Sequence, residues 1–473
     1  MAKNKVAPME SDLEKVRPTP STTLTSSGAS EFQGCWTVVV VSILFIINLL
    51  NYMDRFTIAG VLTDIQDYYH ISDAWGGLIQ TTFMIFFIIF SPICGFLGDR
   101  YNRKWIFVAG ITIWVGAVCA STFIPSNMFW LFLLLRGVVG IGEASYAIIS
   151  PTVIADMFTG VLRSRMLMVF YFAIPFGSGL GFIVGSAVDS LTGHWQWGVR
   201  VTGLLGIICL ILIIAFIRDP ERGKAERDRG EITASVDATN YWEDLKDLCT
   251  NATYITSTFG YTATVFMVGT LAWSQQHGRP PEQRESSSEL GFFGAITCVG
   301  GIAGVAVGTI FSNMWSRGVG PFKHIQTKRA DALVCAIGAF ISIPTLIFAI
   351  LHLSDSNMTF CWIMLFLCVL ASSFNWATNV DLLLSVVIPQ RRSSASSYQI
   401  LISHLCGDAS GPYILGLISD AIRGDDNTPY GHYHSLVTSF YLCVAMLVIS
   451  VILFLAAAYT IVADQRKFAE MMG

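Results

Sequence analysis

The stretch Asn51-Tyr52-Met53-Asp54-Arg55 places two adjacent charges inside the first long apolar segment of the chain. Val38 to Leu50 before it is almost wholly apolar, and Phe56 to Leu62 after it is largely apolar again. An ionised side chain inside a membrane helix is costly unless it faces a protein interior or a water-filled cavity. Such residues usually mark the path of a substrate or a proton, so the first hypothesis is a membrane transporter.

The composition also indicates a membrane protein. Of 473 residues, 53% are hydrophobic and only 13% are charged, whereas soluble proteins have about a quarter charged. The net charge of -4 disfavours nucleic acid as a partner. None of the 11 cysteines forms a Cys-x-x-Cys pair, which favours buried apolar cysteines over disulfides or a metal site. No nucleophile–base pair or metal-ligand cluster indicates an enzyme, and we expect no cofactor other than a coupling proton.

About twelve apolar stretches are long enough to cross a membrane, which takes roughly 20 residues of helix. The predicted fold is an all-α membrane protein with two six-helix bundles. Basic residues gather in the loops on the side of the two chain ends, so we expect both ends in the cytosol. The amphipathic piece Tyr241–Leu248 predicts a helix, either on the membrane surface or in a solvated linker. The predicted parts are a disordered tail (1–32), the first bundle (33–218), a linker with this helix (219–250), the second bundle (251–463) and a second tail (464–473).

A tight loop of glycine and charged residues joins the second and third predicted spans. Its sequence, Gly95-Phe96-Leu97-Gly98-Asp99-Arg100-Tyr101-Asn102-Arg103-Lys104, resembles the signature loop of the major facilitator superfamily, which has Gly, three residues, Asp-Arg, two residues and two basic residues. The alternative is that its basic residues only anchor helix ends on the cytosolic side. The full spacing favours a role in conformational gating rather than in substrate contact. The predicted gating residues are Gly95, Asp99, Arg100, Arg103 and Lys104.

Two further charges lie in the fourth span. Arg136 and Glu143 are seven residues apart, so they share one helix face about two turns apart, and that face is expected to point inward. Asp54 and Arg55 project about 100° apart, so one can face a central cavity while the other pairs with a neighbour. Glu143 and Asp54 are the acids best placed to accept a proton. The alternative is a structural ion pair between the first and fourth spans.

Other polar candidates are sparser. Tyr171 lies in a Gly- and Pro-containing fifth span, and Asn375 lies in the tenth. We predict that both contact substrate. His404 and Asp408 in the eleventh span are one turn apart and could hydrogen-bond. An intramembrane histidine is more often a packing residue, which is the alternative.

Taken together, these segments resemble the spinster family of the major facilitator superfamily. The resemblance implies proton-linked or facilitated movement of lysolipids or sphingolipid phosphates, out of lysosomes in one subgroup and across the plasma membrane in another. It also implies that Asp54, Arg55 and Glu143 are functional and that Arg136 is a charge partner. Relatives have an acid early in the tenth helix, where this chain has Val369–Ser373. The matching segments are 48–56, 98–104, 136–146, 170–181 and 403–420.

The resulting hypothesis is a monomeric, alternating-access carrier of a single-chain amphiphilic lipid. Arg55 would bind the anionic headgroup, with Glu143 close by, and Asp54 and Glu143 would carry the proton. The favoured location is the late endosome or lysosome membrane, with the plasma membrane as the alternative. Two rivals are a carrier of a small polar metabolite and a lipid receptor that transports nothing.

Overall fold

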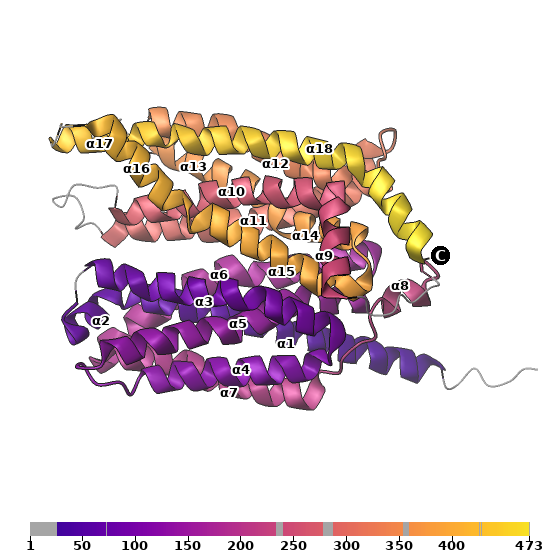
Figure 1. Cartoon of the computed structure of the whole chain (residues 1–473), viewed down its shortest axis with the longest axis horizontal. Helices are drawn as coiled ribbons and strands as arrows, with labels where there is room; N and C mark the ends of the chain where they lie inside the picture. Colours follow the sequence, from indigo (N-terminus) through magenta and orange to yellow (C-terminus); the bar gives the residue numbers. More distant parts are fainter. Residues whose placement is uncertain are drawn as a thin grey trace, which may run out of the picture.

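The computed structural model describes residues 26–71, 73–232, 240–277, 287–352, 359–424, 426 and 428–472. Every element in these ranges is helical, and the helices form two bundles side by side (Figure 1). Ten stretches of this described chain are long and apolar enough to cross a membrane. The predicted all-α membrane fold of two bundles is therefore confirmed.

The first bundle is built from the helices α1 to α7, and a left-handed turn at Gly193 ends α6 before α7 begins. Its elements are α1 (Ser26–Gly60), α2 (Leu62–Tyr69), α3 (Asp73–Arg100), α4 (Arg103–Ser121), α5 (Phe129–Met157), α6 (Gly160–Thr192) and α7 (Trp195–Phe216).

The second bundle has shorter and more interrupted helices. Two of its crossings are broken, one between α13 and α14 and one by a π-helical turn, η4. Its elements are α10 (Ala252–His277), α11 (Ser287–Arg317), η2 (Gly320–Phe322), α12 (Ala330–Leu351), α13 (Thr359–Ser372), α14 (Asn375–Val386), η3 (Pro389–Arg391), α15 (Arg392–Ser403), η4 (His404–Asp408), α16 (Gly411–Arg423), α17 (Pro429–Ser439) and α18 (Tyr441–Met472).

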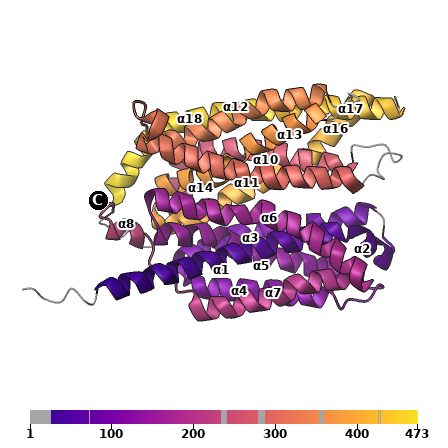
Figure 2. The same cartoon turned by 180° about the vertical axis from the view of Figure 1, so that it is seen from behind.

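The segment between the bundles forms two short helices, α8 (Lys224–Asp228) and α9 (Tyr241–Thr250). They lie at the same end of the molecule as the start of α1 and the end of α18 (Figures 1 and 2). We call this end the linker face and the other end the opposite face. The amphipathic helix predicted in the linker is present as α9.

The helices at both chain ends extend further than the sequence suggests. α1 begins at Ser26, inside the predicted tail, while residues 1–25 lie outside the described part. α18 ends at Met472, although a tail was predicted from residue 464. Residues after 464 include good helix formers, and Arg466 and Glu470 form an i,i+4 ion pair at 3.2 Å. The helix therefore continues past the apolar segment.

Glycines in α6 let α1 approach closely, and this contact places the charged stretch of α1. A Cβ on Gly177 would lie 2.5 Å from the Leu49 carbonyl oxygen, and one on Gly181 would lie 2.5 Å from that of Met53. Real Cβ atoms do not approach so closely, so only glycine fits at these two positions. The packing holds the turn with Asp54 and Arg55 against the interior of the first bundle.

Candidate functional site

The first ion pair of the site joins α1 and α5. Arg55 Nη2 lies 2.5 Å from Glu143 Oε2, and Arg55 Nε donates to the same oxygen at 2.7 Å. The Arg55 side chain is 9% exposed and the Glu143 side chain is fully buried. Two charge-assisted bonds from one guanidinium therefore hold this single carboxylate oxygen.

The second ion pair lies beside the first. It joins the two remaining charged residues, Asp54 of α1 and Arg136 of α5. Arg136 Nη1 donates to Asp54 Oδ2 at 3.0 Å, and both side chains are almost completely buried. Thr202 of α7 donates to the other Asp54 oxygen at 3.1 Å. Asp54 thus points into the first bundle, while Arg55 points toward α3. We call Asp54, Arg55, Arg136 and Glu143 the charge cluster.

Two polar residues complete the surroundings of Glu143. Asn51, with its amide nitrogen turned toward the carboxylate, donates to Glu143 Oε2 at 2.6 Å and accepts from Tyr146 Oη at 2.9 Å. Neither residue, nor Thr202, was predicted to bind the charged side chains of the site. Helical spacing could have found the first two, since Asn51 is four residues before Arg55 and Tyr146 is three residues after Glu143.

Aromatic rings surround the Arg55 guanidinium. Its carbon lies 4.5 Å from the ring centre of Phe83, 5.1 Å from Tyr52 and 5.2 Å from Phe87. A cation over aromatic faces is stabilised by cation–π attraction. The phenyl ring of Phe87 also meets the ring of His404 edge-on, at 5.6 Å between centres. This contact links the neighbourhood of Arg55 to the second bundle.

The polar residues predicted in the second bundle occupy different places. His404 Nδ1 lies 2.9 Å from Asp408 Oδ2, so the expected contact exists, and both side chains are 23% exposed. Asn375 is fully buried and donates to Thr264 Oγ1 at 3.1 Å. Tyr171 packs edge-on against Phe170, with ring centres 5.2 Å apart. No hydrogen bond within the described residues connects Asn375 or Tyr171 to the charge cluster, so their roles in binding stay predictions.

The acid of the loop motif joins the bundles at the linker face. Asp99 accepts hydrogen bonds from the backbone nitrogens of Ser393 and Ser394, at 2.9 and 2.7 Å, at the start of α15. A helix N-terminus favours a carboxylate because its free N–H groups and its dipole are positive. Gly95 permits the contact, since a Cβ there would lie 2.7 Å from the Ser393 carbonyl oxygen.

The basic residues of the same motif separate into two groups. Arg103 pairs with Asp156 at 2.5 Å and Lys104 donates to the Ile214 carbonyl at 2.7 Å, both within the first bundle. Arg100 instead reaches the linker, where it pairs with Asp244 at 2.6 Å. Arg100, Asp99 and Gly95 therefore lie at contacts with the linker or the second bundle, whereas Lys104 contacts the first bundle.

The linker supplies two nearly buried carboxylates, each bound by one arginine from each bundle. Asp244 of α9 pairs with Arg100 at the end of α3 and with Arg391 before α15, at 2.6 and 2.7 Å. Glu226 of α8 pairs at 3.2 Å with Arg163 of α6, and at 2.6 Å with Arg392 of α15. We call these two carboxylates and their four arginines the linker clasp.

A further bond joins the bundles directly beside the clasp. Arg163 Nε donates to Asp381 of α14 at 2.6 Å, and Ser164 donates to the same carboxylate. Asp381 thus pairs across the seam between α6 and α14. Charged groups from three parts of the chain therefore connect the two bundles at the linker face.

Comparison with known proteins gives consistent matches over most of the chain. Residues 44–412 match the model of the Major Facilitator Superfamily. The chain is 42% identical to human protein spinster homolog 1 over 443 residues, which is 91% of this chain and 82% of that protein. It is 40% identical to protein spinster homolog 3 of Danio rerio, over 96% of this chain and 90% of that protein.

A solved structure supports the same fold. A bacterial homolog of the human lysosomal transporter Spinster, in an inward-facing and unoccupied conformation, matches with a TM-score of 0.59 and 19% identity. The match covers 91% of this chain and 98% of the bacterial chain. At this identity the likeness shows that the two chains share an architecture.

Proposed function

Because this chain belongs to the spinster family of the major facilitator superfamily and is a multi-pass membrane transporter rather than an enzyme, we propose that its substrate is a single-chain amphiphilic lipid. A lysophospholipid or a sphingolipid phosphate has this form. The transport would follow alternating access of the two bundles, with a proton as the coupling ion. The observation that carries the proposal is the Arg55–Glu143 ion pair with aromatic rings packed against Arg55.

The surroundings of Arg55 suit the headgroup of such a lipid. An anionic phosphate needs a cation, and the neighbouring chain needs an apolar surface. Arg55 supplies the first, and Phe83 and Phe87 supply the second directly beside it. A sugar would instead call for several uncommitted amide and hydroxyl groups, whereas Asn51 and Tyr146 are already bonded to Glu143 and to each other.

The Arg55–Glu143 pair also provides a way to couple a proton to the lipid. While Glu143 is ionised, it occupies the guanidinium of Arg55 at 2.5 Å. A proton on Glu143 removes the attraction and frees Arg55 for an anionic headgroup. When the proton leaves, the carboxylate takes Arg55 back and displaces the headgroup. Proton binding and lipid binding therefore favour each other.

The Asp54–Arg136 pair has a different place in this mechanism. It is more deeply enclosed than the first pair and is bonded to Thr202 within the same bundle. We propose that Asp54 takes part in proton coupling by adjusting the field at Glu143 through Arg136. The late endosome or lysosome membrane, with both chain ends in the cytosol, is the proposed location, because it offers a proton gradient to such a carrier.

The test is lipid flux into liposomes that contain the purified protein. The panel contains lysophosphatidylcholine, sphingosine phosphate and a hexose, each with and without a pH gradient. We expect flux of a single-chain lipid that the gradient stimulates, and Glu143→Gln should remove the stimulation. Glu221→Gln is the matched control, because among the described residues this exposed linker carboxylate pairs with Arg227 alone.

Three results would reject the proposal. Flux of the hexose alone would identify a carrier of polar metabolites. Lipid binding without flux would identify a receptor on a carrier scaffold. If the pH gradient still stimulated flux fully in Glu143→Gln, Glu143 would not carry the coupling proton, even if the lipid were transported.

A further inference from the structure

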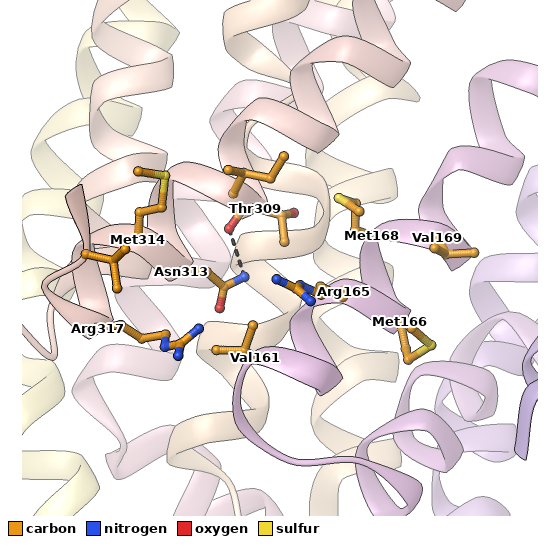
Figure 3. A pocket seen from close by; sticks show the side chains of 11 residues that line it. Val161, Arg165, Met166, Met168, Val169, Thr309, Asn313, Met314 and Arg317 are labelled. Atoms are coloured by element: carbon orange, nitrogen blue, oxygen red, sulfur yellow. Dashed lines mark hydrogen bonds between the residues drawn. The ribbon is translucent and has the colours of Figure 1, made fainter. Parts of the chain in front are cut away.

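A cavity of about 590 Å³ lies between α6 and α11 near the linker face, so each bundle provides one wall (Figure 3). Its volume is in the usual range for ligand-binding pockets. Most of its lining is apolar, and four polar side chains interrupt it: Arg165 of α6, and Thr309, Asn313 and Arg317 of α11. These residues are separate from the charge cluster, which lies on α1 and α5.

The two arginines differ from others at this face. Within the described part of the chain, neither Arg165 nor Arg317 has a carboxylate partner, whereas Arg163, two residues before Arg165, pairs with two acids. Both side chains are exposed and approach one space from opposite walls, with Asn313 between them (Figure 3). Two cations that share a cavity without a counter-ion favour an anionic ligand.

The cavity changes from polar to apolar with depth. α6 runs inward from the linker face and α11 runs toward it, each by 1.5 Å per residue. Arg165 and Arg317 therefore lie nearer to that face than Met168, Val169 and Ile310. Ile310 is also 52% exposed, so the deeper part of the cavity borders an outward-facing apolar surface. This is the polarity order of a phospholipid in the leaflet at the linker face.

We propose that the cavity binds one anionic phospholipid of that leaflet. The phosphate lies between Arg165 and Arg317, and the start of the acyl chains lies along Met168, Val169 and Ile310. Because the lipid bridges α6 and α11, it stabilises contact between the bundles where the clasp also holds them. The proposal goes beyond the transported lipid, since this ligand stays in the leaflet and does not use Glu143.

The test measures lipid binding to the full-length protein by native mass spectrometry, with phosphatidylglycerol and phosphatidylcholine as probes. Phosphatidylglycerol should bind wild type, and the double variant Arg165→Gln/Arg317→Gln should bind it about 25-fold more weakly. Each basic side chain near anionic lipid contributes about fivefold in affinity. Arg218→Gln/Arg329→Gln is the matched control, because it removes two exposed arginines, one on each side of the linker, that lie outside the cavity.

Two more variants separate the effect of charge from that of side-chain shape, and this cavity from the transport path. Arg165→Lys/Arg317→Lys keeps both charges and should retain most of the binding, and Glu143→Gln should not weaken the binding of phosphatidylglycerol. Equal binding of phosphatidylcholine, or equal loss in the matched control, would overturn the proposal. Preference for lysophosphatidylglycerol over phosphatidylglycerol, or loss of binding in Glu143→Gln, would also overturn it, because the cavity would then belong to the transport path.

Discussion

Replacing the two carboxylates of the linker clasp by amides should open the linker face. In Glu226→Gln/Asp244→Asn, four charge-assisted hydrogen bonds become bonds to a neutral acceptor. The difference is about 1 kcal/mol for each bond. Three of the four arginines keep another carboxylate: Arg163 keeps Asp381, Arg391 keeps Asp247 and Arg392 keeps Asp156.

Only part of this loss acts on the conformational equilibrium. When the bundles separate at the linker face, each carboxylate can stay with the arginine of one bundle and must leave the other. The closed state therefore loses one bond per carboxylate relative to the open state. The two carboxylates share no arginine, so their effects should add, to about 2 kcal/mol in all. This corresponds to a roughly 30-fold shift toward the open state, and about fivefold for either single variant.

Distances between spin labels on the two bundles can measure the shift. Tyr101 at the end of α3 and Lys323 after η2 are both exposed at the linker face and can be replaced by cysteine. The exposed Cys249 and Cys406 would first be replaced by serine. The double variant should move the distance distribution toward longer distances in detergent or nanodiscs.

The control is Glu221→Gln, which changes a linker carboxylate whose partner, Arg227, lies in the linker itself. It should leave the distribution unchanged. A wild-type distribution in the double variant, or an equal shift in Glu221→Gln, would refute this role of the clasp. In the first case the linker would be a passive tether, and in the second the shift would reflect net charge alone.

Three other substitutions test separate parts of the site. Asp54→Ala should lower the free energy of unfolding by about 3 to 5 kcal/mol, because it leaves Arg136 buried without a counter-charge, and an unchanged thermal midpoint in detergent would contradict this. Asp99→Ala should lengthen the spin-label distances as the clasp variants do, since α15 loses the acceptor of two backbone N–H groups, whereas unchanged distances would place the closure elsewhere. His404→Gln should change the stability by less than about 1 kcal/mol, because its pair with Asp408 is partly exposed, and a larger loss in denaturant titration would show a packing role.

Much of the charge cluster could be predicted from helical periodicity. Asp54 and Arg55 lie in one apolar helix, and Arg136 and Glu143 share one face of another. Because buried charges need partners, the charged side chains of the two helices are expected to pair with each other. The pairing of Arg55 with Glu143, and of Asp54 with Arg136, could not be predicted. The pairing depends on how α1 is rotated about its own axis. The contact of α1 with α6 at Gly177 determines this rotation.

The linker shows a second limit of prediction from the sequence, which concerns buried charges. Its charges suggest a solvated segment, and its amphipathic piece suggests either a surface helix or a linker helix. In the structure α9 packs on the bundles, with Tyr241 against Phe96 and with Asp244 only 4% exposed. The sequence pattern of α9 does not show that Asp244 lies on its buried side. That burial depends on the arginine partners Arg100 and Arg391, which are distant in the sequence.

The two groups of ion pairs place different demands on a carrier that alternates. At the linker face, charges that separate can be hydrated again, so the cost of breaking the clasp is modest. Arg55 is 9% exposed and Glu143 is fully buried, and a buried charge without a partner costs several kcal/mol. Arg55 must therefore exchange one partner for another rather than lose its partner. A proton on Glu143 together with an anion on Arg55 meets this demand, and a proton alone does not, which is the physical basis for a tight link between the proton and the lipid.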